Sequence, residues 1–222
     1  MDKKVEKDEA IFQVLKKYII ESKKIRFEGN GYGDAWKAEA KKRGLNNIPT
    51  TPGALDAMIS KKTLGLFENL GILSHREQEA RYEISLETYT KKIQIESRII
   101  ADMVNNQIIP SALNYQKGLV ESVKGMKDIM TPAEFKTVAK TQLELIKEIS
   151  ERVAVIKNEA YLMTEERKKA NNLDNAKKQA QAYCDKVKPF FDSIRYNVDK
   201  LDGIVDDATW PLPKYREMLY LR

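Results

Sequence analysis

Apolar residues recur at intervals of three and four along most of this chain, which is the spacing of an amphipathic helix. The clearest stretch runs from Ser74 to about Met126, has no glycine before Gly118 and contains a single proline. A helix cannot bury such a stripe alone, so the pattern predicts that other elements pack along it. The stripe consists of Tyr82, Leu86, Tyr89, Ile93, Ile100 and Met103.

Two further long segments carry the same periodicity. One seam extends from Ile146 to Met163 and a second from Leu173 to Leu201, with a short Asn171-Asn172 turn between them. Short connections favour antiparallel neighbours in helical bundles. We therefore predict an all-α fold whose centre is an antiparallel three-helix bundle of long helices.

Two of the predicted long helices have clear start signals. Ser74 followed by Glu77, and Thr131 followed by Glu134, each match the capping-box pattern. Pro132 at the first helical position strengthens the second signal. The second signal predicts one continuous helix that runs to about residue 170.

Two prolines interrupt the predicted long helices. Pro110 removes a helical hydrogen bond and presses on the carbonyl oxygen of Asn106, and Pro189 acts in the same way near Asp185. Each proline therefore predicts a kink at that point of its helix.

The first part of the chain predicts shorter helices. Residues 5–24 form an amphipathic helix, and Asp34 is placed to cap a short second helix that ends before Gly44. Thr51 is placed to cap the next one, with Pro52 at its first position. The apolar face of the first helix is expected to contain Ile11, Val14, Leu15, Tyr18 and Ile19.

The pattern suggests three subregions: a smaller N-terminal helical part over 1–73, the long-helix bundle over 74–203 and an extended apolar tail over 204–222. Prolines and aromatic residues give the tail this character. Such a tail must dock, either over the chain's own core or in the groove of a partner. The residues expected to dock it are Trp210, Pro211, Pro213 and Tyr215.

Composition agrees with a soluble, helix-rich protein. Of 222 residues, 42% are hydrophobic and 32% are charged, and no apolar run approaches the roughly 20 residues that span a bilayer. The start of the chain is charged and lacks a signal-peptide core, and one cysteine cannot form an internal disulfide. We expect a cytoplasmic protein with no membrane partner.

The net charge of +6 permits an anionic partner without requiring one. Basic residues alternate with acidic residues, as on the solvated faces of helices, and no basic stripe carries interleaved aromatic residues. We therefore expect no nucleic-acid partner.

Residues that carry out chemistry are scarce. With His75 as the only histidine and Cys184 as the only cysteine, an ordinary zinc site is not expected. His75 is expected at the surface, and Cys184 is expected to be a small packed residue without a base to activate it. Glu96 lies on the apolar stripe, where a buried carboxylate needs a partner. We favour an ion pair between helices for Glu96 over a catalytic or metal-binding role.

The glycine-rich loop Gly29–Gly33 admits two interpretations. It could cradle a phosphate, but it lacks the G-K-[ST] ending of a P-loop and does not read G-x-G-x-x-G. The interpretation that we favour is a turn whose glycines supply positive φ angles. An enzyme that uses this loop with Glu28 or Asp34 is therefore the weakest functional hypothesis.

Several long motifs resemble the C-terminal region of type III glutamine synthetases. They are IRFEGNGYGDAWKAEAKKRGL, TTPGALDAMIS, LGLFENLGILSHREQEARYEISLETYTKKIQIES, IIPSALNYQ and WPLPKYREMLYLR. The match extends in order over nearly the whole chain and includes its end. Members of that family form glutamine from glutamate, ammonia and ATP with divalent metal ions, Mg or Mn, in large ring-shaped homo-oligomers.

The resemblance implies a domain of a larger chain that has no catalytic residues of its own. The family's metal-binding and nucleotide-binding residues lie on an upstream catalytic domain, and their motifs are missing here. We therefore assign no catalytic, cofactor-binding or metal-binding residue. The domain would support the catalytic domain or mediate subunit contacts in an enzyme of nitrogen metabolism, with Arg26 and Trp36 at its N-terminal contact.

A free-standing helical interaction module is the second hypothesis. Such a module should expose no orphaned apolar patch, whereas a domain cut from a larger enzyme should leave one. The exposed surface therefore distinguishes the two.

Overall fold

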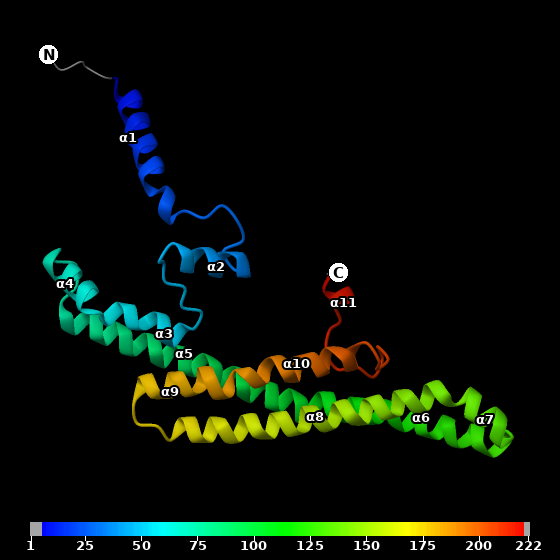
Figure 1. Cartoon of the computed structure of the whole chain (residues 1–222). Helices are drawn as coiled ribbons and strands as arrows, with labels where there is room; N and C mark the ends of the chain where they lie inside the picture. Colours follow the sequence, from blue (N-terminus) through cyan, green and yellow to red (C-terminus); the bar gives the residue numbers. More distant parts are fainter. Residues whose placement is uncertain (1–5, 220–222) are drawn as a thin grey trace, which may run out of the picture. The chain divides into compact units, whose positions relative to one another are not determined.

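The computed structural model of the chain describes residues 6–219, and every regular element among them is a helix (Figure 1). The predicted all-α fold is confirmed. The chain divides into two compact units, Met1–Pro49 and Thr50–Arg222. This division follows residue 49, whereas the sequence suggested boundaries after residues 73 and 203. None of the described helices is long and apolar enough to cross a membrane.

The described part of the first unit, residues 6–49, contains two α-helices. α1 spans Lys7–Glu21 and continues as a 3-10 turn over Ser22–Ile25, and α2 spans Asp34–Lys42. Gly44 follows α2 with a φ of 69°, the left-handed conformation in which many helices end. The predicted helix end before Gly44 is therefore confirmed.

Two predicted helix starts are displaced by one residue. Gly33 and not Asp34 is the N-cap of α2, and no side chain caps this helix. Asp34 is instead the first helical residue, where a negative charge is favourable, and it pairs with Lys37 at 2.7 Å. Thr50 and not Thr51 is likewise the N-cap of α3, since Thr51 already has helical geometry.

The second unit begins with short helices that lie along the first half of α5 (Figure 1). They are α3 (Thr51–Leu55), a 3-10 turn (Asp56–Ile59) and α4 (Lys61–Asn69). Gly71, with a φ of 65°, ends this group in the left-handed conformation.

Three long helical segments form the body of the second unit. The first and third run in the same direction, and α8 returns antiparallel and packs against α5, α6 and α10 (Figure 1). The predicted antiparallel three-helix bundle is therefore confirmed. The segments are α5 (His75–Met103), a π-helical segment (Val104–Ile108) and α6 (Ile109–Ile129); α8 (Lys140–Asn171); and α9 (Ala176–Ala182), a π-helical segment (Tyr183–Val187) and α10 (Pro189–Asp202).

The helix predicted from Thr131 to residue 170 is interrupted. α7 covers only Pro132–Val138 and joins α6 to α8, and the interruption falls at Ala139, which is fully buried. Sequence periodicity could not show this break, because alanine is a good helix former and no glycine or proline marks the position.

Each of the two long-helix prolines follows a π-helical segment. In both segments a backbone N–H donates to the carbonyl oxygen five residues earlier, as from Lys188 to Tyr183 at 2.9 Å. One residue separates each π-helical segment from the proline that follows it, Pro110 or Pro189. The wider turn gives room to the carbonyl oxygens on which the proline rings would otherwise press. The structure therefore shows a π-helical turn before each proline, and the kinks expected there stay predictions.

Both predicted capping boxes are present. The hydroxyl of Ser74 accepts from the backbone N–H of Glu77 at 3.3 Å, and the Glu77 carboxylate accepts from the backbone N–H of Ser74 at 2.8 Å. Thr131 and Glu134 make the same pair of bonds at 3.4 and 3.0 Å. These hydrogen bonds lower the pKa of both glutamates, because they favour the charged carboxylate.

The core of the second unit forms where the three long segments meet. α8 contributes Ile149, Ile156 and Met163 at intervals of seven, and all three are fully buried. The same cluster includes Val104, Ile108, Ala112, Tyr183, Val187, Ile194 and Leu201 from the other two segments.

A polar contact also ties the three segments together. The hydroxyl of Tyr183 donates to the side-chain oxygen of Asn171 at 2.6 Å, and the Gln94 amide donates to the same oxygen at 2.9 Å. These residues belong to the third segment, α8 and α5 respectively. Because Tyr183 is fully buried, its hydroxyl needs such a partner.

We expect Ile149→Ala to lower the free energy of unfolding by about 2–5 kcal/mol, because it leaves a cavity at a fully buried site. Ile95→Ala is the matched control, since Ile95 is 56% exposed on α5 and its loss should change stability by less than about 0.5 kcal/mol. Urea titration followed by circular dichroism measures both. Equal losses in the two variants would contradict the described core.

Candidate functional site

The C-terminal tail folds back onto the chain's own bundle. After α10 the carboxylate of Asp206 accepts hydrogen bonds from the backbone N–H groups of Ala208 at 2.8 Å and Thr209 at 3.2 Å. The backbone N–H of Trp210 donates to the Asp206 carbonyl oxygen at 3.0 Å. This turn places Trp210 in the main hydrophobic core, where 7% of the residue is exposed.

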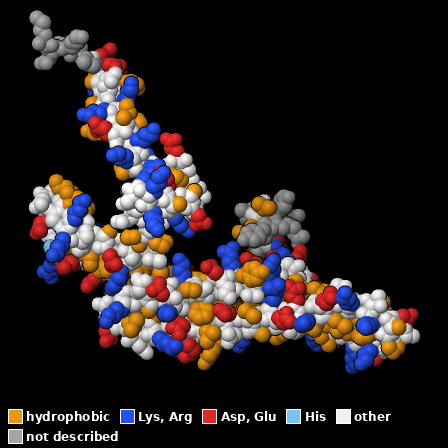
Figure 2. Space-filling view, viewed as in Figure 1, with side chains coloured by type: hydrophobic (Ala, Val, Ile, Leu, Met, Phe, Trp, Pro, Cys, Tyr) orange, Lys and Arg blue, Asp and Glu red, His pale blue; other side chains and the backbone are white. Residues whose placement is uncertain are grey.

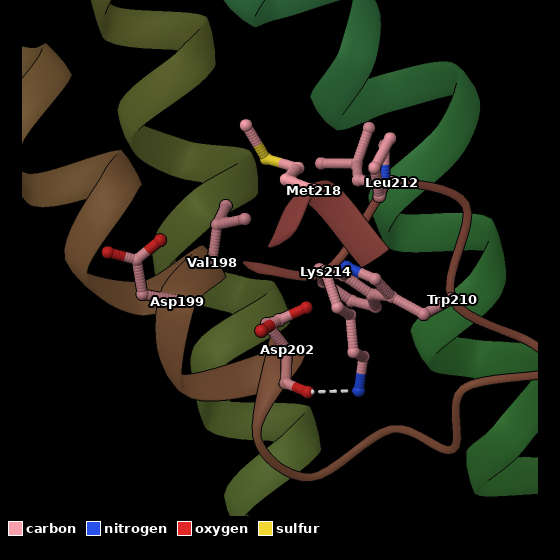
Figure 3. Close-up of a pocket in the computed structure, with 8 residues that line it drawn as sticks. Val198, Asp199, Asp202, Trp210, Leu212, Lys214 and Met218 are labelled. Atoms are coloured by element: carbon pink, nitrogen blue, oxygen red, sulfur yellow. Dashed lines mark hydrogen bonds between the residues drawn. The ribbon is translucent and has the colours of Figure 1, made fainter. Parts of the chain in front are cut away.

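Lys214 fastens the tail at a second point. Its ammonium group donates to the carbonyl oxygens of Asp202 at 2.8 Å and Val205 at 3.4 Å, and it pairs with the Asp207 carboxylate at 2.6 Å. Figure 3 shows the bond to Asp202. A cation is favourable here, because the carbonyl groups at a helix C-terminus carry partial negative charge.

The tail presents alternate side chains to the bundle. Trp210 is buried and Leu212 and Lys214 are half-buried, whereas Pro211 and Pro213 between them are exposed. Successive side chains of an extended chain point to opposite sides, so one set of positions faces inward. This period of two was present in the sequence and would have identified Leu212 and Lys214.

Four tail residues were predicted to dock the tail. The structure places Trp210 against the chain's own core, and it leaves Pro211 and Pro213 exposed. The side chain of Tyr215 lies outside the part of the chain that the structure describes. A role for these residues in contacting a partner stays a prediction.

Two depressions flank the docked tail. A groove of about 480 Å³ lies between α5 and α10 and is lined mainly by apolar residues, including Met103, Phe191 and Leu212. A smaller cavity of about 270 Å³ lies under the tail, with Trp210 and Lys214 in its lining (Figure 3). The groove therefore suits the packing of apolar groups, whereas the lining of the smaller cavity also contains Asp199, Asp202 and Lys214.

A second polar cluster joins the short helices to the bundle. Lys177 of α9 pairs with Asp56 at 2.6 Å and also donates to the carbonyl oxygen of Pro52. The hydroxyl of Tyr82 on α5 donates to the same Asp56 carboxylate at 2.9 Å. The Lys177 bond holds the pKa of Asp56 below its ordinary value, while burial and the Asp56 carboxylate raise the pKa of Tyr82 to about 12. The cluster has the character of a structural clamp.

Arg26 and Trp36 both take part in contacts inside the first unit. The Trp36 ring lies 5.0 Å from the ring of Phe27, measured between centroids. The guanidinium group of Arg26 donates to the Ile19 carbonyl oxygen at 2.7 Å, and Arg43 donates to the carbonyl oxygen of Arg26. Arg26 therefore links the end of α1 to the segment before α2. Its contact with a neighbouring domain stays a prediction.

The predicted burial of Glu96 is wrong, because its side chain is exposed. The buried line of α5 passes through Ile93 and Ser97, and Glu96 lies about 100° around the helix from Ser97. The buried polar residues of α5 are instead Gln78, Thr90 and Ser97. A role for Glu96 at an interface stays a prediction.

The comparison with known proteins is decisive for the family. A model of the family described as the glutamine synthetase C-terminal domain matches residues 10–127. The chain belongs to this family. The resemblance that the sequence motifs suggested is therefore confirmed.

Three curated relatives match almost all of the chain. It is 45% identical over 222 residues to a glutamine synthetase of Bacteroides fragilis (strain YCH46), 33% over 213 to a type-3 glutamine synthetase of Dictyostelium discoideum and 30% over 212 to a glutamine synthetase of Butyrivibrio fibrisolvens. These matches cover 100%, 96% and 96% of the chain but 30%, 29% and 30% of the relatives. The chain thus spans about a third of their length.

Glutamine synthetases generally use ATP and divalent metals, but the described residues do not fit a metal ion. Within residues 6–219, no three acidic, histidine or cysteine side chains gather closely enough to hold one.

His75 is exposed in the first turn of α5, with its Nε2 3.9 Å from the Glu79 carboxylate. Cys184 is half-buried near Tyr89, and the pKa of Tyr89 is raised by burial and by the bond to Cys184.

The glycine loop does not form a phosphate cradle. The side-chain oxygen of Asn30 accepts from the backbone N–H of Tyr32 at 2.9 Å, and its carbonyl oxygen accepts from Gly33 at 3.1 Å. These N–H groups are therefore engaged within the turn. The turn interpretation holds, but the expected positive φ angles are wrong, since the loop glycines do not have them. Gly29 instead leaves room for Phe27, whose ring would lie 2.9 Å from an added Cβ.

We expect Trp210→Ala to lower the free energy of unfolding by about 3–5 kcal/mol, because it removes a large aromatic side chain from the core. Pro213→Ala is the control, since Pro213 is exposed and should change stability by less than about 0.5 kcal/mol. Trypsin should also cleave at Lys214 faster in the Trp210 variant. Unchanged stability and cleavage would show that Trp210 does not hold the tail.

The Asp56 cluster predicts a dependence of stability on pH. The folded-state pKa of Asp56 lies below the ordinary value of 3.8. The Asp56 carboxylate therefore stabilises the fold above pH 3.8, and this stabilisation is lost as the pH falls through the lower folded-state pKa. The difference in free energy of unfolding between the natural protein and Asp56→Asn should therefore shrink as the pH falls from about 5 through 3.8 and on toward the lower folded-state pKa. Asp8→Asn, at an exposed site of α1, is the control. A difference that stays constant with pH would contradict the pairing.

Proposed function

We propose that this chain is the helical, non-catalytic C-terminal part of a longer glutamine synthetase. The longer protein would ligate ammonia to glutamate with ATP and a divalent metal, Mg or Mn, bound elsewhere in it. The observation that carries this proposal is the coverage of the matches. Relatives named as glutamine synthetases align with nearly all of this chain, yet the chain spans about a third of their length.

The proposed role is to support the preceding catalytic part and the contacts between subunits. A bundle with a continuous core and a tail fastened by Trp210 and Lys214 is suited to hold an attached surface in place. The type III assignment is supported by the relative from Dictyostelium discoideum, whose name includes it. We further propose a homo-oligomer that acts in cytoplasmic nitrogen metabolism, with no nucleic-acid partner.

We expect the 222-residue chain alone to show no glutamate-dependent ATP hydrolysis and no tight ATP binding, whereas the intact longer protein shows both. The reason is that the residues that hold ATP and metal would lie outside this chain. Coupled phosphate release and isothermal titration measure the two properties. Turnover by the 222-residue chain would contradict the proposal.

The mass of the natural protein separates this proposal from a free-standing module. An antibody against the chain should detect a band in lysate of the source cell that is roughly three times heavier than 25.5 kDa, because the chain spans about 30% of its relatives. A band at 25.5 kDa would favour an independent helical interaction module.

A further inference from the structure

α1 carries an apolar face that no described residue of its own unit covers, and Figure 2 shows apolar side chains exposed among charged ones along this helix. None of its fifteen residues is buried, and six large apolar side chains on one side are between 47% and 64% exposed. At about 100° per residue, these six positions fall within a single face, while Ile20 lies on the opposite side among lysines. The six residues, called here the α1 face, are Ile11, Phe12, Val14, Leu15, Tyr18 and Ile19.

The opposite side of α1 is polar, and its side chains pair with one another while exposed to solvent. Gln13 donates to Glu9 at 2.6 Å, and Lys17 lies 3.9 Å from Glu21. Pairs at these spacings are typical of a solvated helix surface. α1 therefore has one side made for solvent and one side made for burial.

A helix of this length gains little stability by itself. Isolated helices shorter than about 12–15 residues are marginal in water, and most helical stability in proteins comes from packing of an apolar face. A contiguous exposed apolar patch is also typical of an interaction site. These two properties indicate that the α1 face packs against another surface in the intact protein.

The position of α1 in the family identifies that surface. The model of the glutamine synthetase C-terminal domain begins to match at residue 10, which lies within α1. The relative from Bacteroides fragilis aligns with all of this chain, but the chain covers only 30% of it. α1 is the first helix of the match, and because the matched domain is described as C-terminal, we expect the remaining length of such a protein to come before it.

We propose that the α1 face packs against the region that precedes this domain in the same polypeptide. This inference rests on the proposed function, which supplies the preceding region. A covalently joined neighbour is present at a high effective concentration, whereas a second copy must first lose its translational freedom. Packing of the α1 face against the preceding region therefore costs less entropy than packing against a second copy.

Photo-crosslinking in the intact longer protein tests this contact. p-Benzoylphenylalanine is placed at Tyr18, whose shape it closely matches, and in a second variant at Leu15 of the same face. Ile20 on the opposite side is the matched control, since it is 62% exposed on the same helix. Crosslinked peptides are identified by mass spectrometry in a mixture of light and heavy isotope-labelled subunits.

Both positions of the α1 face should crosslink to peptides that precede this domain, and the crosslinked peptides should carry a single isotope label. The yield should be at least tenfold higher than from Ile20. Crosslinks to residues 50–219 would show that α1 packs on its own bundle, and mixed-label crosslinks would show contact between subunits. Either result, or a yield no greater than that of Ile20, overturns the inference.

The two proposals can fail separately. A natural protein of 25.5 kDa would contradict the proposed function and remove the occupant with it. A heavier protein with ligase activity, in which Tyr18 and Leu15 crosslink elsewhere, would overturn only the contact proposed for the α1 face.

Discussion

Burial of one face of α8 is the constraint on which the second unit depends. Ile149, Ile156 and Met163 lie two turns apart and are enclosed on both sides, so the two other long segments must approach the same line. Apolar contacts are non-directional, so they do not by themselves select one alignment of the helices. Hydrogen bonds among Gln94, Asn171 and Tyr183 require a defined geometry and so favour a single alignment. These hydrogen bonds therefore help to fix how the three long segments align along one another.

The two ends of the described chain differ in how they are completed. The tail is held by a buried aromatic side chain and by an ammonium group on helix carbonyl oxygens, so it closes the bundle from within. α1 has no comparable contact for its apolar side. The apolar side of α1 is therefore the part of the described chain that lacks a packing partner, and the proposed preceding region would supply one.

The sequence predicted the features that depend on local chemistry. Helical periodicity, the two capping boxes and the order of the bundle follow from residues close together in the chain, and each is confirmed. Two features depend instead on which side of a helix meets a neighbour. They are the exposure of Glu96 and the break of the helix at Ala139. That choice is tertiary, because a shift of one residue turns a side chain by about 100°. For the tail, the prediction from sequence included the packing of Trp210 but missed the contacts of Leu212 and Lys214.

The π-helical segments before Pro110 and Pro189 have a consequence for how this fold tolerates changes in chain length. A π turn holds one more residue than an α turn over nearly the same rise, so it stores an insertion without rotating the helix beyond it. Elsewhere in α5 or α8, gain or loss of a single residue would turn every later side chain away from its place in the core. Each of the two interrupted helices therefore contains one turn from which a single residue could be removed without rotating the later side chains, if the proline that follows were also replaced.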